Sequence, residues 1–214
     1  MAKEKFRYYA LKLSLLMIII FVFQIIFPFF TDLFVLNENS YFQPWRFLTA
    51  IFLHGGVAHL ILNLFALVLF GLILENIIGG RKFLLIFIST GILANLISIN
   101  FYSSSLGASG AIFGVIGSLI IIRPLLPVFA FGLPMPIFVA GVLWAGADIL
   151  GTIGFFAGNP IDNTGNIAHL SGMFLGFLLG YFFREKVNKT RKEKIRLDES
   201  YVRRWENHFM KKDI

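Results

Sequence analysis

Long apolar segments recur along the chain and are separated by short polar connections. Six of them stand out, at residues 13–30, 57–78, 83–101, 109–126, 134–157 and 167–183. Each is close to the ~20 residues that cross the hydrocarbon core of a bilayer. Because backbone polar groups find no water there, segments this apolar are expected to be helices. The pattern therefore predicts an all-α membrane protein, built as a bundle of six transmembrane helices.

The polar ends of the chain are short, and no polar stretch between residues 31 and 183 is long enough for a second soluble domain. We predict an N-terminal tail over residues 1–12, a membrane domain over 13–183 and a C-terminal tail over 184–214. The first apolar run follows basic residues, as in a signal peptide. It is long, however, and lacks a small-residue cleavage site, so we interpret it as a retained transmembrane helix.

Composition agrees with this interpretation. Of the 214 residues, 57% are hydrophobic and 14% are charged, whereas about a quarter of a soluble domain is charged. The chain has no cysteine, which excludes disulfides, thiolate metal ligands and a cysteine nucleophile.

The basic residues are distributed unevenly. All of the 19 Lys and Arg residues except Arg46 fall on one side of the predicted bundle. An even number of spans puts both tails on that side, and the positive-inside tendency predicts that this side is the cytoplasm. The net charge of +7 is thus explained by the lipid bilayer, and we expect no nucleic-acid partner. The C-terminal tail is either a helix lying on anionic lipid through Val202, Trp205 and Phe209, or a solvated segment.

Four polar residues are predicted to lie at one depth in the membrane. His59 and Asn63 fall near the start of the second predicted helix, Ser109 at the start of the fourth and His169 in the first turn of the sixth. These three helices run in the same direction, so their first turns share the outer leaflet. Polar side chains are costly in a membrane, which makes such a cluster a candidate functional site.

Small residues repeat every four positions beside both Ser109 and His169. They are Gly110, Gly114 and Ser118 on the fourth predicted helix, and Ala168, Gly172, Gly176 and Gly180 on the sixth. Faces of this kind allow two transmembrane backbones to pack closely. We therefore expect the fourth and sixth helices to bring the serine and the histidine together.

A serine beside a histidine is typical of acyl transfer. The hydroxyl becomes a good nucleophile when a neutral imidazole takes its proton, and imidazole titrates near pH 7. The tetrahedral intermediate then needs hydrogen-bond donors around its oxyanion. Backbone N–H groups at the helix start beside Ser109 can supply them. His59 and Asn63 can donate from the other side.

Several motifs together resemble the rhomboid intramembrane proteases. They are the pair Trp45-Arg46, the run HGGVAHLILN from His54, the GASG of residues 107–110 and the run AHLSGMFLG from Ala168. The motifs come in the order and spacing of the family, and the similarity covers residues 11–183. Taken together they are highly specific, although GASG alone would be weak.

The resemblance implies a multi-pass protein of the cell membrane, with its active site toward the outer leaflet. Such a protein is a serine endopeptidase that cleaves transmembrane protein substrates near their outer ends. By motif match, Ser109 is the nucleophile and His169 the general base, while His59 and Asn63 help to form the oxyanion site. The resemblance implies no cofactor and leaves the oligomeric state undetermined.

Other positions match the family less directly. Trp45 and Arg46 match a structural motif of the membrane-embedded first loop, and Gly107 and Gly110 flank the serine in its motif. Glu75 resembles a structural acidic residue late in the second helix. Phe113, one turn after Ser109, replaces a tyrosine found in many relatives, and its ring can still stack on His169.

Alternatives stay open for these residues. Ser109 could be a packing residue that bonds its own helix, and His59, Asn63 and His169 could only connect helices. His54 is better interpreted as holding the loop. Noncatalytic client binding by the same fold is the main alternative function, and a small transporter is another. A zinc protease would need an HExxH helix, which the sequence lacks, so we predict no metal site.

Two features are harder to place from sequence. Asp148 lies in the middle of the fifth predicted helix. We expect it near mid-membrane, deeper than His169 and outside any catalytic triad, with no partner that the sequence identifies. The loop over residues 157–166 is rich in turn-forming residues, so we expect a mobile lid over the site.

Overall fold

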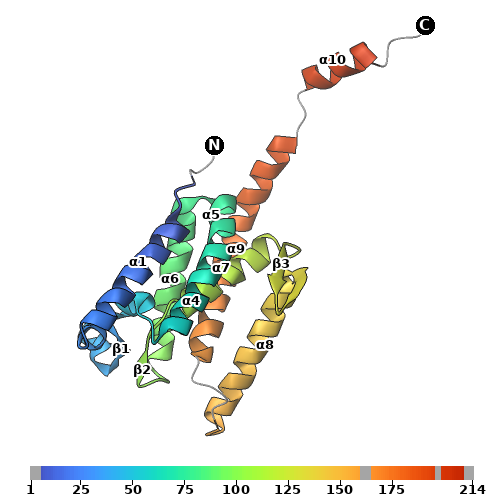
Figure 1. Ribbon diagram of the computed structural model, residues 1–214. Helices are drawn as coiled ribbons and strands as arrows, with labels where there is room; N and C mark the ends of the chain where they lie inside the picture. The colour runs from blue at the N-terminus through green and yellow to red at the C-terminus, as the bar shows by residue number, and fades with distance from the viewer. Residues whose placement is uncertain (1–5, 160–164, 196–198, 210–214) are drawn as a thin grey trace.

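The protein is a bundle of membrane helices, seen here in a computed structural model that describes residues 6–159, 165–195 and 199–209. In Figure 1, α7 lies inside the bundle, with α4, α6 and α9 around it and α8 to one side. The start of α1, the end of α5, the start of α6 and the far part of α9 lie at one end, while β1 and β2 lie at the other. The predicted all-helical architecture is confirmed, apart from two small pairs of strands within the described residues.

The long helices follow the apolar segments, although α1 and α6 begin and end three or four residues earlier than predicted and α7 ends four residues earlier. Their bounds are α1 (Tyr9–Ile26), α4 (Val57–Ala66) continued by the π-helical η3 (Leu67–Gly71) and α5 (Leu72–Ile78), α6 (Gly80–Ser98), α7 (Ser109–Ile122), α8 (Ile137–Phe156) and α9 (Asn166–Ile195). Within the described residues, five helical stretches are long and apolar enough to cross a membrane, and α7 is shorter.

The shortness of α7 has a consequence for the site. A helix of 14 residues is about 21 Å long at 1.5 Å per residue, less than the ~30 Å of hydrocarbon. It ends at Ile122 because Arg123 precedes Pro124 and leaves the helical conformation, at φ −142°. A helix this short cannot reach both surfaces of the hydrocarbon core, so Ser109 at its other end can lie within the membrane.

The first loop, between α1 and α4, contains four short helices and one strand. They are α2 (Phe30–Phe34), β1 (Leu36–Asn37), η1 (Glu38–Tyr41), α3 (Arg46–Thr49) and η2 (Ala50–Phe52). Arg46 is buried and donates to the carbonyl oxygens of Asp32 and Val35, each at 2.8 Å, and to Gln43 Oε1 at 2.6 Å. Trp45 is half exposed. The guanidinium thus holds the loop together from inside.

The start of the fifth helix differs from the prediction. Residues Pro127–Ala130 (β3) and Leu133–Pro136 (β4) pair as an antiparallel hairpin, so α8 begins at Ile137 and not at residue 134. Pro136 is extended, with ψ 142°, and it occupies the position just before the helix. The apolar residues of β4 from 134 to 136 were predicted from the sequence to be the start of the helix. The other strand pair joins β1 to β2 (Ser104–Ser105).

The C-terminal region also departs from the predicted limits. The sixth helix was expected to end at residue 183, yet α9 continues through charged residues to Ile195. The helix α10 (Glu199–Phe209) follows, and the rings of Trp205 and Phe209 lie 5.4 Å apart on it. A helix therefore forms at the predicted place. Its location on lipid stays a prediction.

Helices α6, α7 and α9 are packed through small residues. A side chain at Gly172 or Gly176 would collide with the backbone carbonyl of Gly110 or Gly114. One at Gly180 would come within 2.9 Å of the α7 backbone. Gly114 was expected to face the sixth predicted helix, but a side chain added to it would collide with Thr90 of α6. The stripe on α7 thus accommodates two neighbouring helices.

Glu75 fixes the start of α1. Its carboxylate is fully buried and accepts hydrogen bonds from the backbone N–H groups of Arg7, Tyr9 and Ala10, at 2.9, 3.1 and 3.2 Å. The first N–H groups of a helix have no partner within the helix, and an acid near them is also favoured by the helix dipole. Glu75 has the structural role that the sequence indicated.

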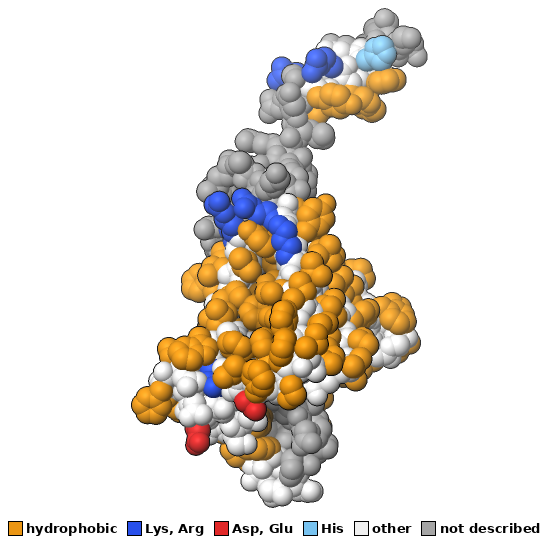
Figure 2. Space-filling view, turned by 60° about the vertical axis from the view of Figure 1, so that its left-hand side comes forward, with side chains coloured by type: hydrophobic (Ala, Val, Ile, Leu, Met, Phe, Trp, Pro, Cys, Tyr) orange, Lys and Arg blue, Asp and Glu red, His pale blue; other side chains and the backbone are white. Residues whose placement is uncertain are grey.

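Side chains of different kinds occupy different zones of the surface. Figure 2 shows Lys and Arg side chains gathered near the end from which α9 extends, a broad apolar zone beside them and acidic side chains toward the opposite end. A wide apolar surface bounded by polar ends is what a lipid-facing protein requires.

Candidate active site

One large cavity joins the four polar residues singled out in the sequence. It has a volume of about 1530 Å³, and its lining includes His59, Asn63, Ser109 and His169. The four residues come from α4, α7 and α9. Their predicted convergence in one place is confirmed. Their chemical roles stay a prediction.

Ser109 is placed by the start of α7. Gly107, two residues earlier, has a φ of +122°, a conformation that favours glycine. A side chain there would also lie 2.7 Å from His59 Cε1. Gly110 lies where three helices meet, since a side chain on it would contact Ala94 of α6 at 2.5 Å and the carbonyl of Ala168 at 3.4 Å. The glycines on both sides of Ser109 are therefore required by close contacts.

His169 is held against α7 by an aromatic contact. Its ring stacks on Phe113, with centroids 4.3 Å apart and planes at 11°, as the sequence predicted. Phe113 lies four residues after Ser109, and residues at that spacing share one face of a helix. The imidazole is thereby held over the helical face that begins with Ser109.

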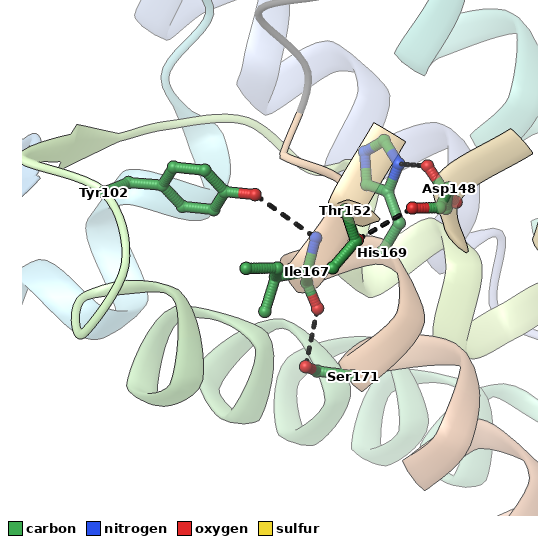
Figure 3. Close-up of polar contacts among 6 residues, drawn as sticks. All are labelled: Tyr102, Asp148, Thr152, Ile167, His169 and Ser171. Atoms are coloured by element: carbon green, nitrogen blue, oxygen red, sulfur yellow. Dashed lines mark hydrogen bonds and ion pairs between the residues drawn. The ribbon is translucent and has the colours of Figure 1, made fainter. Parts of the chain in front are cut away.

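A second contact of His169 was missed by sequence reasoning. Its Nδ1 lies 2.9 Å from Asp148 Oδ1, and the two side chains are only 13% and 8% exposed. Figure 3 shows the carboxylate of α8 directed at the imidazole of α9. The expectation that Asp148 lies deeper than His169 and has no identifiable partner is wrong.

The physical reason lies in the ends of the two helices. The expectation placed Asp148 near mid-membrane because it lies in the middle of the fifth predicted helix. In the structure, α8 extends past the level at which α9 begins (Figure 1), so the middle of α8 faces the first turn of α9. The burial cost of a carboxylate in a membrane indicated that a partner was needed, but not which one.

The wall formed by α4 carries His59 and Asn63. The backbone N–H of Gly55 lies 3.4 Å from His59 Nδ1 and donates to it, so Nε2 carries the hydrogen of a neutral ring. Asn63 is buried, and its Nδ2 donates to the carbonyl of His59 at 2.8 Å. An amide nitrogen has two hydrogens. Both residues therefore retain a donor for another group.

His54 lies beneath this wall and not in the lining of the cavity. Its ring is 5.2 Å from that of His59. Its backbone exchanges two hydrogen bonds with Gln24 of α1, at 3.0 and 3.2 Å. Burial lowers the pKa of His54 to about 4, and His59 adds to the effect. His54 thus stays neutral and connects the loop to α1.

Some candidate features lie outside this geometry. Within the described residues, no three His, Asp or Glu side chains are grouped as metal ligands would be. The predicted lid spans residues 157–166, but residues 160–164 lie outside the described part of the chain. The lid stays a prediction.

Comparison with known proteins identifies the family. A family model for the Rhomboid domain matches residues 41–186. The chain belongs to the rhomboid family. With its apolar helices, it is a multi-pass membrane protein.

Individual rhomboid relatives align over about two thirds of the chain. It is 38% identical over 145 residues to "Rhomboid protease GluP" of Bacillus subtilis, covering 64% of this chain and 27% of that protein. It is 34% identical over 148 residues to "Rhomboid-like protein 11, chloroplastic" of Arabidopsis thaliana, covering 64% and 52%. With "RHOMBOID-like protein 4" of the same plant, identity is 30% over 147 residues, covering 65% and 34%. The chain thus spans between about a quarter and a half of these relatives.

Proposed function

We propose that this rhomboid is an intramembrane serine endopeptidase that hydrolyses peptide bonds in or near the transmembrane segments of other membrane proteins. The observation that carries the proposal is the position of His169. Its ring lies flat on Phe113, one turn from Ser109, and it lines the same cavity as Ser109. The name of the Bacillus subtilis relative, a rhomboid protease, supports the same conclusion.

In the proposed reaction, Ser109 Oγ attacks the carbonyl carbon of the substrate while His169 Nε2 takes the hydroxyl proton. The negative charge that develops on the carbonyl oxygen is stabilised by His59, Asn63 and the N–H groups at the start of α7. The C–N bond then breaks, and His169 gives its proton to the leaving amine. Water, activated in the same way, hydrolyses the acyl-enzyme and restores Ser109.

The cavity suits a substrate that arrives from the membrane. Its lining combines the four polar residues with large apolar side chains of α4, η3 and α8, among them Phe65, Leu69, Phe70, Trp144 and Phe155. Apolar walls around a few polar groups are typical of substrate sites. A transmembrane segment can use the apolar walls while its cleaved bond reaches Ser109.

We also propose that the protein lies in the cell membrane with both tails in the cytoplasm. The cluster of basic side chains near the far part of α9 supports this orientation (Figure 2). Arg81→Cys and Glu38→Cys, at opposite ends of the bundle, provide the test because the chain has no cysteine of its own. A membrane-impermeant maleimide applied to intact cells should label only Glu38→Cys. Labelling of Arg81→Cys alone would reverse the orientation.

Cleavage is tested with the purified protein in lipid vesicles and a single-pass membrane protein as substrate. Wild type should produce two fragments, while Ser109→Ala and His169→Ala should each abolish cleavage, because the two residues act as a unit. The double variant should be no worse than either single variant. Thermal unfolding of each variant controls for folding.

A fluorophosphonate probe, which reacts with activated serines, adds a test that needs no substrate. It should label wild type and not Ser109→Ala. Substrate retention without cleavage or labelling would instead support noncatalytic client binding. Activity that survives His169→Ala would exclude His169 as the base.

A further inference from the structure

The carboxylate of Asp148 occupies an unusual place for a charged group. It lies on α8, in a membrane-spanning helix, and Asp148 is only 6% exposed. Its Oδ1 contacts His169 Nδ1 at 2.9 Å (Figure 3). Its other oxygen, Oδ2, is buried without a hydrogen-bond partner among the residues that the structure describes. The contact with His169 is therefore the polar contact that the structure assigns to this side chain.

Stability alone explains this arrangement poorly. Taking a carboxylate out of water is costly, and a buried ion pair often stabilises a fold no better than apolar residues of similar volume. Here one of the two oxygens has no hydrogen-bond partner within the described part of the chain, which adds to the cost. A group kept at such a cost is a candidate for function.

The contact has a definite chemical consequence for the imidazole. An ionised carboxylate only accepts hydrogen bonds, so Nδ1 of a neutral His169 must carry the hydrogen. The lone pair is then on Nε2, the nitrogen that a general base needs free. When His169 takes a proton, the carboxylate also faces the positive charge that forms.

We propose that Asp148 is a positioning residue for His169, completing a Ser109–His169–Asp148 arrangement in place of a simple dyad. This inference rests on the proposed function. Asp148 touches no substrate. It selects the tautomer of His169, orients its ring together with Phe113 and stabilises the imidazolium, as the aspartate does in soluble serine proteases.

The kinetic test compares Asp148→Asn with Thr152→Val. The asparagine keeps the size of the side chain but removes its charge and can donate to Nδ1. The control lies one turn further along α8, where the Thr152 hydroxyl bonds the carbonyl of Asp148 at 2.7 Å and so serves its own helix. Asp148→Asn should lower kcat by about 10²-fold to 10⁴-fold with KM little changed. Thr152→Val should stay within about threefold of wild type.

A spectroscopic readout separates this inference from the proposed function. Nitrogen-15 NMR of labelled histidine reports which ring nitrogen carries hydrogen, and His169→Gln assigns the signal among the four histidines. Wild type should show His169 with hydrogen on Nδ1, and Asp148→Asn should lose that preference. This measurement needs neither a substrate nor cleavage.

The outcomes are distinct. If wild type cleaves and Asp148→Asn keeps kcat within threefold, the positioning role is overturned. If wild type does not cleave, the proposed function fails. The NMR measurement of the His169 tautomer then still tests whether Asp148 determines which ring nitrogen carries the hydrogen. Hydrogen on Nε2 in wild type overturns the inference even if Asp148→Asn fails to fold.

Discussion

The two sides of the candidate site are constructed differently. On one side, α7 and α9 meet backbone to backbone through Gly110, Gly172 and Gly176, and Ser118 Oγ donates across to the carbonyl of Gly176 at 2.8 Å. On the other side, α8 has only five buried residues, at positions 137, 140, 141, 148 and 151. The proposed nucleophile and base thus lie on the closely packed side, and Asp148 contacts His169 from the loosely packed one.

This difference indicates that one side positions the proposed catalytic groups and the other admits the substrate. Catalytic distances must be held within a fraction of an ångström, and close-packed backbones provide that precision. A wall that a substrate must pass has the opposite requirement, since local openings come from regions with few buried contacts. The exposed faces of α8 belong to that second kind, with Leu150 at 62% and Ile153 at 59%.

The largest effect should come from matched glycine substitutions on the two sides. Gly172→Leu drives a side chain into the carbonyl of Gly110 and should reduce cleavage by about 10²-fold or more, because a shift of ~1 Å at the catalytic pair is enough for that. Gly146→Leu on α8, where the added carbon meets no described residue within 4 Å apart from the adjoining backbone of α8 itself, should keep both activity and melting temperature. Equal effects of the two substitutions would refute the comparison.

The next effect concerns the α4 wall of the cavity. Asn63→Ala and His59→Ala should each lower kcat by about 10-fold to 10³-fold with little change in KM, since the oxyanion forms only during the reaction. Steady-state cleavage in vesicles measures both constants. Normal turnover in both variants would leave the oxyanion to the backbone N–H groups of α7 alone.

A smaller effect is expected far from the site. Glu75→Gln keeps an oxygen for two of the three N–H groups but turns an amide toward the third, so the protein should lose about 1–3 kcal/mol of stability. Cleavage at low temperature should remain near that of wild type. Thermal unfolding and cleavage measured on one sample separate the two effects. A strong loss of turnover without a loss of stability would contradict a purely structural role.

The last effect is a pH dependence of stability, which is absent at neutral pH. His54 lies in the connection before α4, and burial lowers its pKa from 6.5 to about 4. Between these values the unfolded chain binds a proton that the folded protein does not, so stability is full above pH 6.5 and falls toward pH 4. His54→Phe should flatten that fall in melting temperature. An unchanged slope would mean that other groups cause it.

The sequence predicted those parts of the fold that depend on local patterns. The limits of the helix over residues 57–78 match α4, η3 and α5, whereas the fourth segment was predicted to run to residue 126 and α7 ends at Ile122, two residues before Pro124. The hairpin β3–β4 was not recognised, because Pro134 and Met135 continue an apolar run that also suits a helix start. Hydropathy does not distinguish a short apolar strand from the first turn of a helix.

In the candidate site, too, features set by position along one helix were predictable, and a contact set by packing between helices was not. Direction and position along each helix were enough to bring Ser109, His169, His59 and Asn63 to one cavity, and a spacing of four residues put Phe113 against His169. The contact of Asp148 depended on how far α8 extends past the start of α9. That offset is set by packing between helices, which no local pattern records.

The anchoring of α1 by Glu75 affects when the helix can be fixed during synthesis and which residues at its start can be substituted. The matched rhomboid domain begins at residue 41, so α1 precedes it, and its N-terminal anchor is made about 65 residues later in the chain. The first helix cannot be fixed at its start until the ribosome has delivered the end of the second. In addition, the hydrogen bonds that the carboxylate accepts from residues 7, 9 and 10 all come from backbone N–H groups. The exposed side chain of Arg7 can therefore change without loss of its hydrogen bond to Glu75, provided that it does not become proline, whereas Ala10 is also fixed by its complete burial.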